Sequence, residues 1–309
     1  MRNFSALMPL PVWRACCMLL FLFLAANTGA IAQVDTTQVD QKLIIGKRII
    51  IETKDGSVIQ GKYMGHTENG IKVQTESAGE LTIPNDQITW MKVVEDDRFK
   101  DGEYWFENPN ATRYLFSPSA FSLKKGEAYY QNTYLIINSF NFGVTDNLTI
   151  GGGFELYSTV TGDPIFFISP KYSFPISKNL RAGAGLLYVN ALDSNDGFTG
   201  LGIGYGIVTY GNTDDNITVG LGYGFVEKEL SEKPVFTFSG MKRLSRRFGL
   251  VSENWLVPTD DYYGIYSYGL RFMGERMTVD FAFLNNPDIA SDVTFIGFPY
   301  IDFVIRFGK

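Results

Sequence analysis

The residue types that most often carry out catalysis or bind metals are nearly absent from this chain of 309 residues. It contains one histidine, His66, and two cysteines, Cys16 and Cys17. Nucleophilic catalysis usually pairs a serine or cysteine with a histidine base, and protein zinc sites need several His or Cys ligands. Because no histidine follows position 66, both kinds of site are excluded from residues 67–309. We therefore predict a protein that is not an enzyme and that has no cofactor.

A second set of chemically capable residues lies in the C-terminal two thirds, where apolar and polar residues alternate. Successive side chains of a strand point to opposite faces. Alternation assigns these charged residues to the polar face: Glu155, Lys171, Arg181, Lys242, Glu253, Arg271, Asp280, Asp302 and Arg306. In a membrane barrel they would line the lumen, because an Arg or Lys facing lipid at the midplane costs about 2–4 kcal/mol. Five are basic and four acidic, so they either pair across a narrow lumen, which this balance favours, or line a water-filled path.

The elements that would position these charges repeat one unit, in which about ten alternating residues precede a turn. Transmembrane strands need about 9–11 residues, and single-chain bacterial barrels have an even number of them. Short connections favour up-and-down neighbours, and Phe and Tyr near strand ends are typical of membrane girdles. A water-soluble all-β domain, with the apolar face as its core, is the alternative. The predicted strands are 112–121, 128–142, 147–158, 163–174, 180–191, 199–210, 216–227, 233–243, 247–256, 262–273, 276–284 and 297–307.

Two glycine runs, at 200–206 and 220–224, have a period of two. A phosphate-binding loop would lie between a strand and a helix, so these runs are not such loops. The alternation predicts that Ile203 and Tyr205, like Val219 and Leu221, face lipid, while the glycines face the lumen. The glycines then either leave the lumen wall without side chains or allow the sheet to curve.

Residues 1–32 are typical of a secretory signal peptide. Arg2 and Arg14 supply positive charge, an apolar stretch follows, and Ala30-Ile31-Ala32 is a small-residue cleavage site. Both cysteines lie inside this segment, so the mature chain would contain none. Its 25 basic and 33 acidic residues would give a net charge of −8, which argues against a general affinity for nucleic acid.

A small β-domain is predicted at 43–94, between a flexible segment at 33–42 and a linker at 95–111. Its five short strands are separated by Asp55-Gly56 and Asn69-Gly70, which supply the positive φ that tight turns need. With Gly61-Lys62 and Ile83-Pro84, these residues resemble an Sm-like or SH3-like small barrel. Some such domains bind RNA, but here acidic and basic side chains nearly balance, so we expect a protein contact.

Residues 112–309 resemble Gram-negative outer-membrane barrels of the porin-like kind. The resemblance rests on the hairpin Gly143-Val144-Thr145-Asp146-Asn147 and on the last strand, Tyr300–Phe307, which is similar to their C-terminal assembly signal. In this chain Gly308-Lys309 follow the final aromatic residue, where that family usually ends. The resemblance implies insertion by the barrel-assembly machinery and contact with outer-membrane lipid. Separately, turns at 144–147, 175–178, 211–215, 244–247 and 274–275 follow every second predicted strand, and with the N-terminal domain and the C-terminus on the same side these turns are periplasmic.

The sequence therefore predicts an all-β protein in the cell outer membrane: a small N-terminal β-barrel-like domain in the periplasm, followed by an antiparallel up-and-down transmembrane β-barrel of about twelve strands. We expect a narrow pore or a structural component of the outer membrane. The alternative is a membrane-anchored binding module whose residues 43–94 recruit a periplasmic protein partner. A lipid-modifying barrel enzyme fits less well, because its barrel would have to work without histidine.

Overall fold

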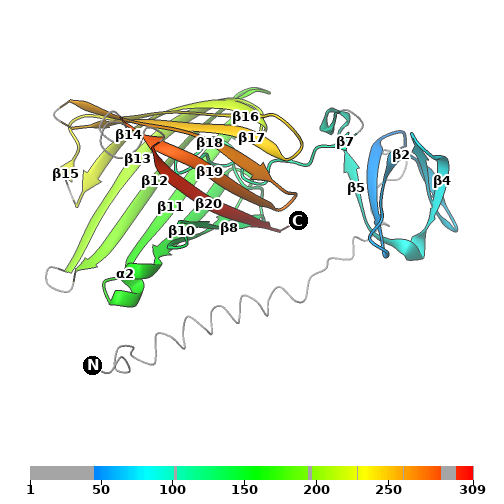
Figure 1. The fold of residues 1–309 in the computed structure, drawn as a ribbon, viewed down its shortest axis with the longest axis horizontal. Helices are drawn as coiled ribbons and strands as arrows, with labels where there is room; N and C mark the ends of the chain where they lie inside the picture. Colours follow the sequence, from blue (N-terminus) through cyan, green and yellow to red (C-terminus); the bar gives the residue numbers. More distant parts are fainter. Residues whose placement is uncertain are drawn as a thin grey trace, which may run out of the picture. The chain divides into compact units, whose positions relative to one another are not determined.

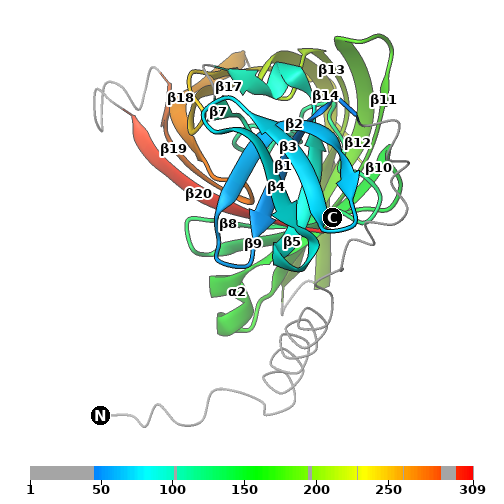
Figure 2. The same cartoon turned by 90° about the vertical axis from the view of Figure 1, so that its right-hand side faces the viewer.

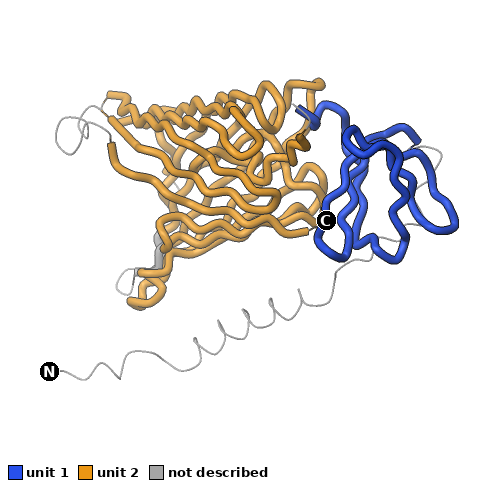
Figure 3. The backbone as a smooth tube through the Cα atoms, turned by 45° about the vertical axis from the view of Figure 1, so that its right-hand side comes forward, with its two compact units in different colours: residues 1–102 blue, residues 103–309 orange. Residues whose placement is uncertain are grey.

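The computed structural model describes residues 45–100, 103–193, 197–227, 229–259, 261–286 and 297–308. The chain divides into two compact units, residues 1–102 and residues 103–309 (Figure 3). The predicted signal peptide at 1–32 and the predicted flexible segment at 33–42 lie outside the described residues. Among the described residues, no helix combines the length and the hydrophobicity that crossing a bilayer requires.

The first unit contains one antiparallel sheet of five strands, in the order β4-β3-β2-β1-β5 (Figure 2). The strands are β1 (Arg48–Thr53), β2 (Val58–Thr67), β3 (Gly70–Thr75), β4 (Gly79–Pro84) and β5 (Ile88–Val94). Ile49, Ile51, Tyr63, Ile71 and Val73 form its buried core. The five predicted strands are confirmed, whereas an Sm-like or SH3-like barrel closure stays a prediction.

The turn between β1 and β2 shows why the predicted hairpin forms there. Gly56 adopts φ +82°, which a residue without Cβ adopts at little cost. The carboxylate of Asp55 accepts hydrogen bonds from the Thr53 hydroxyl at 2.6 Å and from the Ser57 amide at 3.0 Å. These bonds hold the pKa of Asp55 below its ordinary value.

The second unit is a closed antiparallel barrel of twelve strands, because the last strand, β20, pairs with the first, β8 (Figure 1). Short elements flank or join the strands: β6 (Phe99–Lys100) and β7 (Glu103–Tyr104) precede them, α2 (Leu156–Thr161) follows β10, and β15 (Glu229–Leu230) follows β14. The twelve strands are β8 (Ala128–Thr133), β9 (Ile137–Gly143), β10 (Leu148–Glu155), β11 (Ile165–Pro175), β12 (Leu180–Asp193), β13 (Gly197–Gly211), β14 (Asp215–Val226), β16 (Val235–Arg243), β17 (Phe248–Pro258), β18 (Tyr262–Met273), β19 (Met277–Asn285) and β20 (Phe298–Phe307).

The predicted strand number is confirmed, but two of the predicted strands are wrong. Residues 112–121 form no barrel strand, and the predicted strand 128–142 is instead two strands, β8 and β9. A turn separates these two strands, with Tyr134 and Leu135 at φ 55° and 65°. Neither residue type favours positive φ, so the sequence carried no turn signal at this point. The two errors cancel in the count.

The outer surface of the barrel is apolar, and β14 illustrates the alternation that produces it. Val219 and Leu221 are 53% and 45% exposed, whereas Thr218, Gly220 and Gly222 between and beside them face inward and are buried. Large apolar side chains are exposed on strands all around the barrel, among them Phe140, Ile150, Ile168, Val208, Phe238, Leu250, Leu270, Phe281 and Ile301.

The prediction for β13 is wrong, because its faces are reversed. Ile207 is 4% exposed, and Ile203 and Tyr205 also lie inside the barrel, while Gly204 has open space where its Cβ would be. The glycine faces of the neighbouring strands make this possible. A Cβ on Gly222 of β14 would lie 2.9 Å from Ile203 Cδ1, and one on Gly185 of β12 would lie 2.4 Å from the Tyr205 hydroxyl.

Because of this arrangement, a larger side chain is expected to be tolerated at a glycine of β13 but not at a glycine of β14. Gly222 lies opposite Tyr205 in the register, and Gly204 lies opposite Tyr223. We expect Gly222→Val to destabilise the barrel by about 1–3 kcal/mol, because the new side chain overpacks Ile203. Gly204→Val, which enters open space, is expected to be neutral or stabilising. The temperature at which the folded band is lost in heat-modifiable gel migration measures both, and equal shifts would contradict the inward packing of Ile203.

Candidate functional site

An irregular segment lies inside the barrel, and we call residues 105–127 the lumen loop. It runs into the barrel interior, reverses at Tyr114–Ser117, and returns to the first strand. The Tyr114 amide donates to the Ser117 carbonyl at 2.9 Å, and the Ser119 amide donates to the Thr112 carbonyl at 3.0 Å, so the reversal is a tight hairpin. Leu115 at its tip is fully buried. The sequence had assigned this segment to a linker and to a first strand.

Lys171 of β11 holds both arms of the lumen loop. Its ammonium donates to the carbonyls of Thr112, Ser119 and Phe121 at 2.9, 2.7 and 2.7 Å. An irregular buried backbone leaves carbonyls without partners from regular secondary structure, and a cation with three donors can satisfy three of them. Arg181 of β12 adds a fourth such bond, from its Nε to the carbonyl of Ala120 at 2.9 Å.

Glu253 of β17 is negatively charged, and it binds the amides at the tip of the loop, whereas the cations Lys171 and Arg181 bind carbonyls. One carboxylate oxygen, Oε2, accepts the backbone amides of Leu115, Phe116 and Ser117 at 2.9, 2.9 and 2.8 Å. The other oxygen accepts the indole N–H of Trp255 at 2.7 Å. The side chain of Glu253 is almost fully buried, so these are charge-assisted bonds in a water-poor environment.

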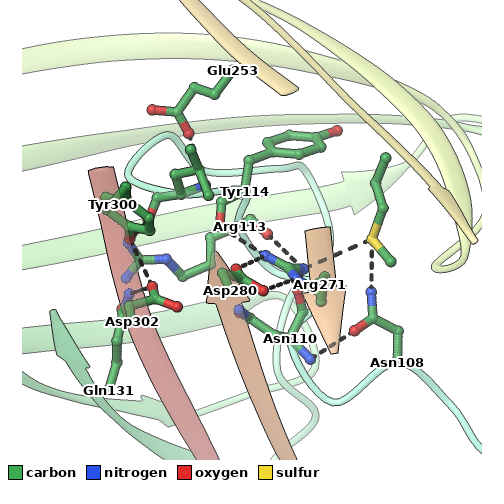
Figure 4. Close-up of polar contacts among 12 residues, drawn as sticks. Asn108, Asn110, Arg113, Tyr114, Gln131, Glu253, Arg271, Asp280, Tyr300 and Asp302 are labelled. Carbon is green, nitrogen blue, oxygen red and sulfur yellow. Dashed lines mark hydrogen bonds and ion pairs between the residues drawn. The ribbon is translucent and has the colours of Figure 1, made fainter. Parts of the chain in front are cut away.

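Arg271 and Asp280, on the adjacent strands β18 and β19, form a fully buried ion pair (Figure 4). The guanidinium is bidentate, with Nε and Nη2 donating to the two carboxylate oxygens at 2.8 and 2.6 Å. The remaining donors bind the lumen loop, at the carbonyls of Asn110 (2.6 Å) and Tyr114 (2.8 Å). The pair thus joins the barrel wall to the first arm of the hairpin.

Asp302 of β20, beside this pair, accepts hydrogen bonds from neutral side chains (Figure 4). Its Oδ2 accepts hydrogen bonds from the Gln131 amide at 2.5 Å and from the Tyr300 hydroxyl at 2.7 Å. The Tyr300 hydroxyl also lies 3.0 Å from the Leu115 carbonyl. On the loop, the Tyr114 hydroxyl donates to Asn216 Oδ1 at 2.6 Å.

Two predicted lumen residues lie elsewhere. Lys242 is 65% exposed and pairs with Asp215 at 3.3 Å, on the same outward face as Phe236 and Phe238. In the sequence, the spacing of Lys242 from Phe236 and Phe238 was the signal that Lys242 points outward with them. Glu155 is the N-cap of α2, where its carboxylate accepts the amides of Tyr157 and Ser158 at 2.8 and 2.6 Å. A carboxylate at a helix N-terminus satisfies otherwise free backbone donors.

Arg243, next to Lys242, is one of the interior charged residues that the sequence pattern did not indicate; Arg113, Asp214 and Glu127 are others. The buried guanidinium of Arg243 donates to the Phe106 carbonyl at 2.6 Å and to Asp214 at 2.9 Å. It also lies over the Phe106 and Trp105 rings, with its carbon 4.9 and 5.2 Å from their centres. At the other end of the loop, Arg306 binds Glu127 at 2.7 Å.

These contacts answer the question of whether the inward charges pair across the lumen or line a water path. Arg271 pairs with Asp280 on the next strand, while Lys171, Arg181 and Glu253 bind the main chain of the lumen loop. The near balance of charges therefore reflects the needs of a buried backbone, which presents both carbonyls and amides. In the part of the chain that is described, no three acidic, His or Cys side chains gather as a metal site would require.

Beyond the lumen loop the barrel interior holds a partly open cavity of about 290 Å³. Strands β8–β11 give it a polar wall that includes Gln131, Ser139, Asn141, Ser169 and Lys171. Strands β12–β17 give it an apolar wall that includes Leu187, Val189, Ile203, Val235 and Trp255. Its floor is the lumen loop, through Thr112, Arg113, Phe116 and Pro118. The cavity therefore has one polar and one apolar side.

No model of a known protein family matches the chain, and no curated protein sequence matches it. Similar solved structures include the NanC porin, with a TM-score of 0.37 and 10% identity over 60% of this chain and 99% of that one. The KdgM porin, solved with disordered oligogalacturonate, has a TM-score of 0.37 and 9% identity over 59% and 95%. Outer membrane phospholipase A from Escherichia coli has a TM-score of 0.30 and 8% identity over 60% and 92%. Likenesses this distant say nothing about ligand or activity.

The hydrogen bonds from three loop amides to Glu253 allow a direct test of what keeps the loop inside the barrel. Glu253→Gln keeps the size of the side chain but replaces the carboxylate by one neutral acceptor and an amide group. We expect hydrogen exchange at Leu115–Ser117 to accelerate by about 10- to 100-fold, since bonds to charged groups contribute about 1.5–3 kcal/mol. Asn254→Ala is the control, because its amide reaches only Phe238 and Ser252. Unchanged exchange in the glutamine variant would show that the loop is held by other contacts.

Proposed function

We propose that this protein is a non-enzymatic outer-membrane barrel that forms a channel, and that the lumen loop closes the channel at the end of the barrel where Phe106 and Gly308 lie. The lumen loop is the observation that carries this proposal: it occupies part of the barrel interior, yet it forms none of the barrel strands. In the predicted orientation, with the first unit in the periplasm, the closed end is the periplasmic one.

The outer surface supports a membrane location. Apolar side chains that are 40–55% exposed, such as Phe238, Leu250 and Ile301, would be a liability on a protein surrounded by water. In lipid the same side chains are favourable, and the closed hydrogen-bonded ring of strands leaves no sheet edge without partners. A polar, charged interior behind an apolar exterior is typical of outer-membrane barrels.

The way the loop is attached supports a gate rather than a permanent core. The barrel closes through its own strand pairs, β8 with β20 included, so its hydrogen bonding does not depend on the loop. The loop is held by separate side chains, above all Lys171, Glu253 and Arg271. Leaving the lumen would break these contacts without opening a strand pair.

A disulfide that locks the loop tests the channel directly. The hydroxyls of Ser117 on the loop and Ser239 on β16 lie 2.9 Å apart, and the predicted mature chain has no other cysteine. We expect brief conductance steps for the unaltered protein in planar bilayers, and none for oxidised Ser117→Cys/Ser239→Cys until reductant is added. Replacing residues 110–121 by a short Gly-Ser linker should give larger, sustained steps, because the obstruction is gone.

Each outcome of that experiment has a separate meaning. Conductance that the disulfide leaves unchanged would show that the loop is not the barrier. Silence in every variant, the loop replacement included, would overturn the channel. The barrel would then serve as an anchor, and the five-stranded unit would be the functional part, recruiting a periplasmic partner.

The membrane location has its own test on the outer face. Val219 lies in the middle of β14 and is 53% exposed, whereas Ile176 lies in a turn and is 56% exposed. We expect Val219→Arg to lower the free energy of unfolding in lipid vesicles by about 2–4 kcal/mol, and Ile176→Arg by about 0–1 kcal/mol, because the cost of a charge depends on depth. Urea unfolding followed by tryptophan fluorescence measures both. Equal, small effects would mean that the outer face does not contact hydrocarbon.

A further inference from the structure

We propose that the lumen cavity binds a single-tailed anionic amphiphile, such as a medium-chain carboxylate. The head would lie near Arg113 and Lys171, and the tail would lie along the apolar wall of β12–β17. This goes beyond the proposed channel, and it can be tested by binding alone, so its failure and that of the channel are distinguishable.

The apolar wall indicates the body of the ligand. Inward positions of an aqueous lumen are ordinarily polar. Here β12, β13, β16 and β17 instead present Leu187, Val189, Ile203, Val235 and Trp255 to the cavity. On β14 the inward residues beside them are Gly220 and Gly222, and side chains of the neighbouring strands, Ile203 among them, lie over these glycines. A hydrocarbon chain would remove these surfaces from water, whereas a sugar or an inorganic ion would not.

The charges indicate the head group. Arg113 and Lys171 are the charged residues that line the cavity, and both are positive. Within the described residues, neither has a carboxylate within 4.0 Å. The carboxylates of Asp302 and Glu253 attract Arg113 from a distance; both oxygens of Glu253 and Oδ2 of Asp302 hold other donors, while Oδ1 of Asp302 has no partner. Buried cations without a counter-ion are unfavourable, and an anionic ligand would supply the missing charge.

Unused polar atoms point to the same place. Arg113 Nε is buried without a hydrogen-bond partner, although its guanidinium also reaches the Leu115 carbonyl. A carboxylate can accept from Nε. Gln131, 2% exposed, has a buried carbonyl oxygen without a partner, and this oxygen could accept from a water bound to the head group. Both side chains line the cavity on its polar side or floor.

The size of the cavity limits the ligand to one tail. A cavity of about 150 Å³ can hold one benzene ring, so a volume of 290 Å³ has room for about twice as many carbon atoms. A medium-chain acid fits this space, and a two-tailed membrane lipid does not. The bilayer lipids around the barrel are therefore not the expected occupants.

Trp255 provides the readout, because it lines the cavity. The predicted mature chain has two further tryptophans, Trp90 and Trp105, and Trp90→Phe/Trp105→Phe leaves Trp255 alone. This protein, in phosphatidylcholine nanodiscs, is titrated with ω-brominated decanoate and, separately, with the ω-brominated alcohol of equal length. We expect saturable quenching by the carboxylate, with a Kd lower than that of the alcohol by about ten-fold or more. Excess unbrominated decanoate should restore the fluorescence.

Matched variants locate the site. Val189→Phe narrows the cavity and should abolish the saturable quenching, whereas Val208→Phe, on the outer face of the next strand, should leave it unchanged. Arg113→Gln should bring the carboxylate down to the affinity of the alcohol, and Arg113→Lys should keep most of its advantage. Hydrogen exchange at Leu115–Ser117 checks that the loop remains in place in both Arg113 variants.

Two results would overturn the proposal. Equal affinity for carboxylate and alcohol in the parent protein would show that the site does not recognise an anionic head group. Quenching that excess decanoate does not reverse, or that Val189→Phe leaves intact, would mean that the bromine reaches Trp255 from the lipid and that the cavity is not the binding site.

Discussion

A backbone that is shielded from water needs a hydrogen-bond partner for every amide and carbonyl, and this need shapes both parts of residues 103–309. The strands satisfy it among themselves, through a ring that closes where β20 meets β8. The lumen loop has no strand partner, so side chains of the wall must serve it instead. Lys171 supplies donors to its carbonyls, and Glu253 accepts from its amides. The inward charges therefore serve as hydrogen-bond partners for the irregular backbone of the lumen loop.

This view explains why the inward charges differ in their burial and partners. Arg271 serves two loop carbonyls and is itself neutralised by Asp280, which makes a fully buried guanidinium tolerable. Lys171 serves three carbonyls and has no carboxylate beside it. Carbonyl dipoles satisfy its donors but leave its net charge uncompensated. The two cations thus share a structural task, and of the two only Lys171 borders the cavity.

The sequence was sufficient for properties that depend on one strand at a time. Alternation predicts the antiparallel barrel, ten of its twelve strands and the turns on one side, because the residue pattern of each strand distinguishes its two faces. It could not predict which face of a glycine-rich strand turns inward. In β14 the apolar face is outside, but in β13 Ile203 and Tyr205 are inside, and Gly222 and Gly185 on the neighbouring strands decide this. Such packing depends on which residues of neighbouring strands meet, and the alternation within one strand carries no information about that.

The lumen loop was misread for a related reason. Residues 112–121 alternate weakly and resemble a strand, yet their partners are distant in sequence: Thr112 meets Lys171, and Leu115 meets Glu253. A count of charges suggested pairing among side chains, since five basic and four acidic residues nearly balance. A backbone segment presents acceptors and donors in equal number, so it can absorb both signs without any side-chain pair. Charge balance on a lumen wall is therefore as much a sign of an internal chain as of a closed ion-paired lumen, and only the positions of the charges relative to that chain distinguish the two.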